Sequence, residues 1–220
     1  MPTSTVEDYL KCILLEQQDD AEALVPMGQI AAALKVAPGT VTAMVKTLAD
    51  GGLVTYEPYS GVRLTQPGRQ LAAHVLRRHR LVELFLVKIM GMDWSEVHSE
   101  AEELEHAMSD RLVERMDEML GFPSVDPHGD PIPDVHGVMK LPERPSLLTC
   151  GLGSPVRVAR VADQSREFLQ LLERRSLKPG SSLIVERRDE AADTVDLRHE
   201  GGAELSLGFR AASKIFVEPG

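Results

Sequence analysis

The spacing of hydrophobic residues over the first 65 positions predicts three short helices followed by a hairpin. The segments with helical periodicity are residues 6–16, 27–36 and 40–50. Only the turn Ala37-Pro38-Gly39 separates the second segment from the third. Alternating residues on both sides of Pro58–Gly61 predict a β-hairpin directly after the third helix. Two amphipathic helices around a tight turn, followed by a hairpin, predict a winged helix-turn-helix.

The middle of the chain has helical periodicity over 66–91 and again over 95–120, which predicts two long helices. Four prolines then fall between Gly121 and Pro133, so no helix is expected there and the segment to Ser146 is interpreted as an irregular connector. The acidic and imidazole side chains of this connector are interpreted as turn and surface residues; they are Asp126, His128, Asp130 and His136.

The last part of the chain alternates in the manner of short β-strands, with one helical stretch at 163–173. The predicted strands are 156–161, 182–186, 194–197, 203–207 and 214–217. Five short strands in so few residues favour a small, partly open barrel. The predicted fold class is therefore mainly α with a small β domain. The predicted parts are a winged helix-turn-helix at 1–65, a helical domain at 66–136, a linker at 137–146 and a β domain at 147–220.

The distribution of charge allows a nucleic-acid partner although the net charge is −10. Residues 81–130 hold thirteen Asp and Glu against three Lys and Arg, whereas the first eighty residues hold eight of each kind. No apolar run approaches the ~20 residues of a membrane span. The sequence has only 2 cysteines, which favours a reducing cytoplasm and no disulfide framework. They form no Cys-x-x-Cys pair, so a zinc or thioredoxin-like site has no support.

The third helix of the winged part presents an outer face suited to a DNA major groove. Its apolar side would pack inward, which leaves small, hydroxylated and basic side chains outside: Gly39, Thr40, Thr42, Ala43, Lys46 and Thr47. No carboxylate interrupts this face before Asp50, so phosphates and thymine methyl groups can approach it. Arg63 on the hairpin could reach a phosphate or could be an ordinary solvated arginine. Helix pairs of this kind also occur in proteins that never contact DNA.

A second cluster of candidate functional residues has the spacing of metal ligands. His98, Glu102, Glu105 and His106 stand at i, i+4, i+7 and i+8, which places them on one face of a helix. Such groups repel one another and desolvate badly when buried, unless a cation lies among them. A solvated acidic face is the alternative. A di-iron carboxylate enzyme would need a second Glu-x-x-His motif on another long helix, and the sequence has none.

The order of these parts and several motifs resemble the diphtheria toxin repressor and manganese transport regulator family of metal-dependent bacterial repressors. The matching stretches are 7–10, 37–53, 64–69, 78–83, 97–110 and 126–133. The C-terminal part resembles the SH3-like domain of the family in length, in strand pattern and in the segment 167–172. The resemblance implies a cytoplasmic homodimer that binds double-stranded DNA and has no catalytic activity.

The resemblance also implies two metal sites per subunit. The primary ligands would be Asp8, Glu102, Glu105 and His106. The ancillary ligands would be His79, Glu83 and His98, completed by Gln164 and Glu167.

Two departures from relatives bear on the choice of metal. The iron-responsive members place a methionine and a cysteine where this chain has Asp8 and Glu102, and carboxylates favour harder ions than thioether or thiolate sulfur does. The primary site therefore predicts Mn(II), with Fe(II) as the competitor. Lys11 replaces a glutamate of some manganese-responsive members, which argues against a two-metal cluster there. The predicted function is a manganese-activated repressor of metal-uptake genes; the alternatives are an iron-activated repressor and a metal-insensitive winged-helix regulator.

Overall fold

The computed structural model describes residues 3–17, 20–139 and 142–220. The chain divides into two compact units. The first contains Met1–His79, Glu103–Ser109 and Pro133–Met139; the second contains Arg80–Glu102, Asp110–Ile132 and Lys140–Gly220. Within the described ranges, no helix is both long and apolar enough to cross a membrane.

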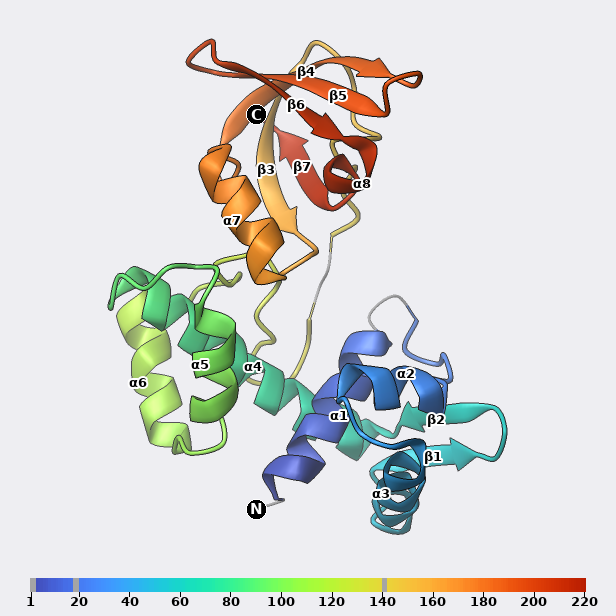
Figure 1. Ribbon diagram of the computed structural model, residues 1–220. Coiled ribbons are helices and arrows are strands. Elements are labelled where there is room, and N and C mark those ends of the chain that lie inside the picture. The colour runs from blue at the N-terminus through green and yellow to red at the C-terminus, as the bar shows by residue number, and fades with distance from the viewer. Residues whose placement is uncertain (1–2, 18–19, 140–141) are drawn as a thin grey trace. The chain divides into compact units, whose positions relative to one another are not determined.

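The first unit has the predicted winged helix-turn-helix. Its elements are α1 (Ser4–Glu16), α2 (Met27–Ala33), α3 (Pro38–Asp50), β1 (Val54–Glu57), β2 (Gly61–Leu64) and the first part of α4 (Gln66–Lys88). β1 and β2 form an antiparallel hairpin, the wing, beside α3 (Figure 1). Leu10, Ile13 and Ile30 are fully buried in the core that these elements share.

Helix α3 forms where the sequence predicts it, because its ends and its inner face are both well specified. Pro38 occupies the first turn, where its missing N–H costs nothing. Val41, Val45 and Leu48 recur at helical spacing and are buried against the core. The helix ends before Gly52, whose φ of +71° suits glycine.

The second helix of the middle segment differs from its prediction. Instead of one helix over 95–120, the chain forms α5 (Val97–Leu104) and α6 (Asp110–Leu120), with a non-helical segment at 105–109 between them. The helix ends where Glu105 becomes completely buried and meets charged partners from α1 and α4. These contacts stabilise a bend that the helical periodicity of the sequence does not show.

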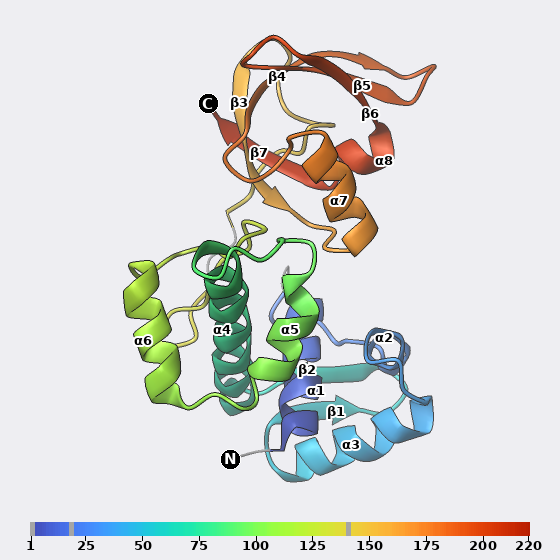
Figure 2. The same ribbon diagram turned by 60° about the vertical axis from the view of Figure 1, so that its left-hand side comes forward.

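The C-terminal part of the second unit is the predicted small β domain. Its elements are β3 (Pro155–Val161), α7 (Arg166–Arg174), β4 (Ser182–Asp189), β5 (Thr194–His199), β6 (Glu204–Gly208), α8 (Phe209–Ala212) and β7 (Ile215–Pro219). The strands form one antiparallel sheet in the order β6-β5-β4-β3-β7. The sheet curls around an apolar core into a partial barrel (Figure 2).

The connector after α6 contains no named helix or strand among its described residues, as predicted. The interpretation of its polar residues as surface groups is wrong for three of them: Asp126, His128 and Asp130 are 4%, 0% and 6% exposed. The loop is held against β3, because the backbone N–H of Val161 donates to the carbonyl of His128 at 2.9 Å. Proline density shows that a segment is irregular, but it does not show whether the segment is buried.

Gly129→Ala is expected to destabilise this loop by about 2–4 kcal/mol. Gly129 has a φ of +87°, and a Cβ there would lie 2.0 Å from the backbone oxygen of Ala159. Gly121→Ala is the matched control, because Gly121 has a φ of +75° with nothing within 4 Å of its Cβ position. Chemical denaturation measures the free energy of unfolding of both variants. Equal losses of stability would show that the close approach of Gly129 to β3 does not matter.

Candidate metal centre

Three of the predicted primary ligands lie together in the first unit. Asp8 comes from α1, and Glu105 and His106 come from the turn after α5. His106 Nε2 lies 2.9 Å from Asp8 Oδ1 and 3.3 Å from Glu105 Oε1. One ligand atom from each residue falls within 4.8 Å of the others. Carboxylate oxygen and imidazole nitrogen are donors that suit Mn(II) and Fe(II), so the residues fit a divalent cation.

Glu7 orients His106 and was not recognised from the sequence. Its Oε2 lies 2.7 Å from His106 Nδ1, so the imidazole donates to Glu7 through Nδ1 and turns Nε2 towards Asp8. Arg78 holds the other oxygen of Glu7 at 3.3 Å. A carboxylate behind a ligating histidine fixes its ring and tautomer. The available signal was the position of Glu7 on the buried face of α1, in line with Leu10 and Leu14.

Glu105 is the most enclosed member of the group and is held by two donors. Lys11 Nζ donates to Oε1 at 2.6 Å, and His79 Nδ1 lies 2.6 Å from Oε2. Burial alone would raise the pKa of Glu105, but the hydrogen bonds and charges of His79 and Lys11 outweigh burial and lower this pKa. The lowered pKa favours the ionised carboxylate, which is the form that can ligate a cation.

The protonation of His106 is set by the acidic groups around it. Burial would lower its pKa, but the hydrogen bond to Glu7 and the charges of Glu105 and Asp8 have the larger combined effect and raise this pKa. Only the neutral imidazole can ligate a metal, so a cation at Nε2 has to compete with a proton.

Glu102, the fourth predicted primary ligand, lies one turn along α5 from His98. The distance from Glu102 Oε1 to His98 Nε2 is 3.8 Å, and the Glu102 side chain is 39% exposed. His98 also approaches Glu83, with 3.2 Å between its Nδ1 and Oε1 of Glu83. His79 and Glu83 are one turn apart on α4, as predicted.

A buried group in the second unit was missed by the sequence interpretation. Glu83, Asp126 and His128 each offer a ligand atom within 4.8 Å of the others, and all three are buried. Asp126 Oδ2 and His128 Nδ1 have no hydrogen-bond partner within the described part of the chain. Burial and the nearby charges of Asp130 and Glu83 raise the pKa of Asp126 well above its ordinary value. A cation among these groups would relieve both the desolvation and the repulsion.

The two predicted ligands of the β domain have other surroundings. Gln164 Nε2 donates to Asp130 Oδ2 at 2.7 Å, and Arg160 Nε donates to Oδ1 of the same aspartate at 2.5 Å. Glu167 lies exposed in the first turn of α7. The groups of His, Cys, Asp and Glu found within ligand distance among the described residues do not include Glu167.

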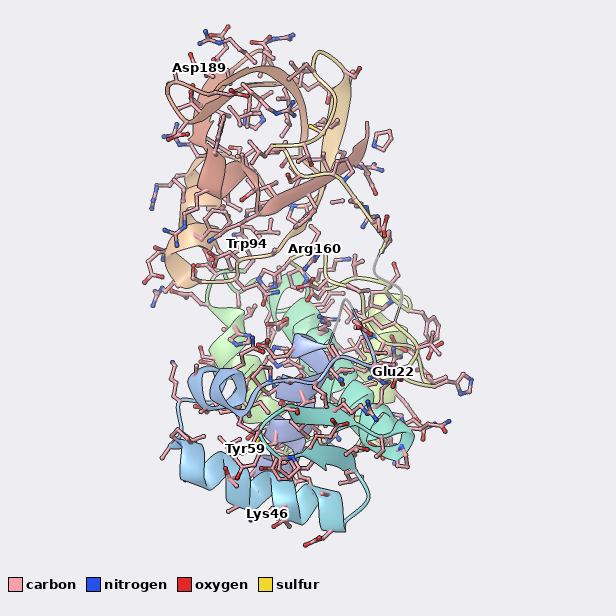
Figure 3. The ribbon with its side chains drawn as sticks, turned by 90° about the vertical axis from the view of Figure 1, so that its right-hand side faces the viewer. Glu22, Lys46, Tyr59, Trp94, Arg160 and Asp189 are labelled. Carbon is pink, nitrogen blue, oxygen red and sulfur yellow. The ribbon has the colours of Figure 1, made fainter. Side chains whose placement is uncertain are left out.

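The predicted DNA-contacting face of α3 is exposed. Gly39, Thr40, Ala43, Lys46 and Thr47 are exposed and Thr42 is partly buried. Lys46 points away from the core of the winged unit (Figure 3). The hydroxyls of Thr42 and Thr47 donate to carbonyls of their own helix, at 3.1 and 3.2 Å.

The same pair of hydrogen bonds decides what the two threonines offer to a partner. Their hydroxyl hydrogens are already used, so they present oxygen acceptors and methyl groups. Arg63 on the wing is half-buried. Its guanidinium group lies 3.8 Å from Oε1 of Glu57, and this carboxylate partly offsets its positive charge.

Together, a winged helix-turn-helix and a carboxylate–imidazole group define a DNA-binding regulator with a candidate metal centre. The sequence profile described as "Iron dependent repressor, N-terminal DNA binding domain" matches residues 1–62. The profile described as "Iron dependent repressor, metal binding and dimerisation domain" matches residues 65–134, and the FeoA domain matches residues 146–219.

Relatives described as iron-dependent or manganese-dependent regulators align over almost the whole chain. The iron-dependent repressor IdeR of Mycobacterium tuberculosis is 35% identical and covers 97% of this chain and 96% of its own length. A solved manganese-dependent transcriptional repressor in complex with manganese is 39% identical, with a TM-score of 0.86 over 97% of this chain and 99% of that chain. The manganese regulator SloR is 33% identical, with a TM-score of 0.73 over 100% of both chains.

The chain therefore belongs to the iron-dependent repressor family, the diphtheria toxin repressor family of metal-dependent DNA-binding transcriptional repressors. This confirms the resemblance found in the sequence.

Proposed function

We propose that the protein is a manganese-activated, dimeric repressor of metal-uptake genes that acts on operator DNA in the cytoplasm. The observation that carries this proposal is the convergence of Asp8, Glu105 and His106 around one point. Glu102, which the resemblance implies, is proposed as the fourth ligand. The protein would bind and release DNA and would catalyse no reaction.

The donor types support Mn(II) over Fe(II). Three carboxylates and one imidazole form a harder donor set than a site that contains sulfur. Cys12 is buried and its pKa is raised to about 11 by burial first, with Glu16 adding to it, so it is not a ready thiolate ligand. Solved relatives described as manganese-dependent are 39% and 37% identical to this chain, and iron-dependent relatives are also similar, so Fe(II) is the competing activator.

The positions of the ligands explain how metal and DNA binding would be linked. Asp8 belongs to the segment that matches the DNA-binding profile, whereas Glu105 and His106 belong to the segment that matches the metal-binding and dimerisation profile. A bound cation supplies positive charge that carboxylates from both segments share. Conformations that bring Asp8 to His106 are then favoured, and operator DNA must tighten metal binding by the same factor.

We also propose the predicted functional division of the chain: DNA binding by 1–65, metal binding and dimerisation by 66–136, a linker at 137–146 and an SH3-like domain at 147–220.

Titration of the purified protein with Mn(II) tests the function. A DNA fragment would first be selected from a random pool with Mn(II) present, and its binding would then be followed by fluorescence anisotropy. Saturable binding that depends on Mn(II) and is reversed by a chelator is expected. Equal DNA binding with Mn(II) and with chelator would indicate a metal-insensitive regulator instead.

For a second ion, we propose the buried group of Glu83, Asp126 and His128. This choice is supported by the absence of a hydrogen bond, among the described residues, to Asp126 Oδ2 and His128 Nδ1. Arg80 Nε lies 3.7 Å from the first of these atoms, and Glu83 Oε2 lies 3.9 Å from the second. The ligand set implied by the resemblance also contains Glu83, and Nδ1 of His98, another member, lies 3.2 Å from Glu83 Oε1. Two further members also have partners outside the set: His79 lies against Glu105, and Gln164 lies against Asp130. His98 and Glu167 complete this alternative set.

His128→Ala is expected to remove the second binding event, whereas His98→Ala should retain it. Isothermal titration calorimetry with Mn(II) measures the number of ions bound by each variant. His136→Ala is the control, because His136 is exposed in the same connector. Loss of the second ion in His98→Ala alone would favour the alternative set.

Lys46→Ala is expected to weaken binding to specific and random DNA alike. Its ammonium group can neutralise one phosphate, so the slope of log K against log salt concentration should decrease in magnitude by about 0.9.

Changes at Thr40 or Thr42 should reduce specificity more than affinity, because the start of a recognition helix usually lies nearest the base edges. Anisotropy titrations at several salt concentrations, with specific and with random DNA, measure the affinity of each variant. Lys88→Ala is the control for Lys46→Ala, because Lys88 is also exposed. Curves that overlay those of the wild type would place the DNA-binding face elsewhere.

A further inference from the structure

A lysine in the segment that matches the DNA-binding profile donates a hydrogen bond to a proposed metal ligand. Lys11 lies one turn after Asp8 on α1, and its Nζ donates to Glu105 Oε1 at 2.6 Å. The same oxygen lies 3.3 Å from His106 Nε2, which is the nitrogen that faces Asp8. The ammonium group of Lys11 therefore holds the carboxylate oxygen that a cation at this site would use.

This ion pair is shielded from water. The Lys11 side chain is 8% exposed and the Glu105 side chain 0%. Charges that are paired in such surroundings interact strongly, and each becomes costly when its partner is removed. Displacement of Lys11 from Glu105 therefore has a substantial free-energy cost unless another cation replaces it.

Two carboxylates at this site already have cationic partners from the chain itself. Arg78 pairs with Glu7, and Lys11 pairs with Glu105. Part of the repulsion expected from the sequence is therefore offset by Lys11, a side chain that the spacing of the acidic cluster does not reveal. A divalent cation gains less from entering such a group than from entering an uncompensated one.

We propose that Lys11 is a tethered competitor of the activating metal. In the metal-free protein its ammonium group neutralises Glu105, and it has to leave Oε1 before that oxygen can act as a ligand. Lys11 thereby weakens metal binding and raises the metal concentration at which the protein binds DNA. This inference rests on the proposed metal-dependent function and identifies the residue that sets its threshold.

Lys11→Met tests the inference, because it removes the charge and retains most of the aliphatic stem. We expect the Kd for Mn(II), measured by isothermal titration calorimetry without DNA, to fall by about tenfold or more. The Tm in chelator should fall, because Glu105 loses its partner, whereas saturating Mn(II) should restore it. A purely structural defect would weaken metal binding, so tighter binding is diagnostic.

Three further variants make the test specific. Lys11→Arg retains the charge and should keep the Kd near that of the wild type. Lys35→Met removes an exposed lysine of the same unit and should also leave it unchanged, which excludes an effect of net charge. Lys11→Gln is neutral and polar and repeats the measurement if Lys11→Met does not fold.

The failures of the two proposals are distinguishable. If wild-type protein binds no Mn(II), the proposed function is wrong. If the wild type binds Mn(II) and both neutral variants bind it equally or more weakly, Lys11 is not a competitor and the inference is overturned.

Discussion

Asp8→Ala is expected to abolish Mn(II)-dependent DNA binding. Asp8 is the only proposed primary ligand on α1, so its loss separates the metal site from the DNA-binding segment. Mn(II) affinity should fall by about 100-fold or more, since the remaining ligands cannot complete the site. The fold should persist, because Asp8 is only partly buried. Calorimetry gives the Mn(II) affinity, and fluorescence anisotropy with the selected DNA fragment gives the functional loss.

Glu102→Ala is expected to act in the same direction. Glu103→Ala is the matched control, because Glu103 neighbours it on α5 and is exposed. Wild-type Mn(II) dependence in either Asp8→Ala or Glu102→Ala would show that the site assignment is wrong.

The double change Asp8→Met and Glu102→Cys is expected to change which metal activates the protein. The activation order should shift from Mn(II) towards Fe(II), Co(II) or Ni(II), because thioether and thiolate sulfur are softer ligands than carboxylates. DNA binding titrated with each ion under anaerobic, reducing conditions measures the order. The control is the single change Asp8→Glu, which keeps a carboxylate. An unchanged order in the double variant would locate metal selectivity outside the primary site.

Much of the fold could be predicted because the spacing of hydrophobic residues within each segment indicates whether it forms a helix or a strand. The inner face of α3 and the turn before it are visible as residue spacing, and so is the alternation of β3 to β7. The break at 105–109 could not be predicted in this way. The periodicity continues through it, whereas the contacts that stabilise the bend come from Lys11 and His79, far away in the sequence.

The candidate metal ligands were predictable to a similar extent. Helical spacing identified Glu105 and His106 as candidate ligands, whereas Asp8 was inferred from the resemblance to the family. Neither route identified the contact between Glu7 and His106, which are 99 residues apart. The buried position of His128 was also missed, because it depends on how the connector packs against β3.

The sequence by itself determined the types of the elements, the family and the kinds of donor at the metal centre, because each depends on residue identity and short-range spacing. Only the tertiary structure decided how the charges are paired. Burial makes a carboxylate depend on its nearest partner, and those partners come from distant segments: Arg78 for Glu7 and Lys11 for Glu105. Along one helix Glu105 belongs to a repulsive cluster, whereas in the folded protein its charge is compensated by Lys11 of α1.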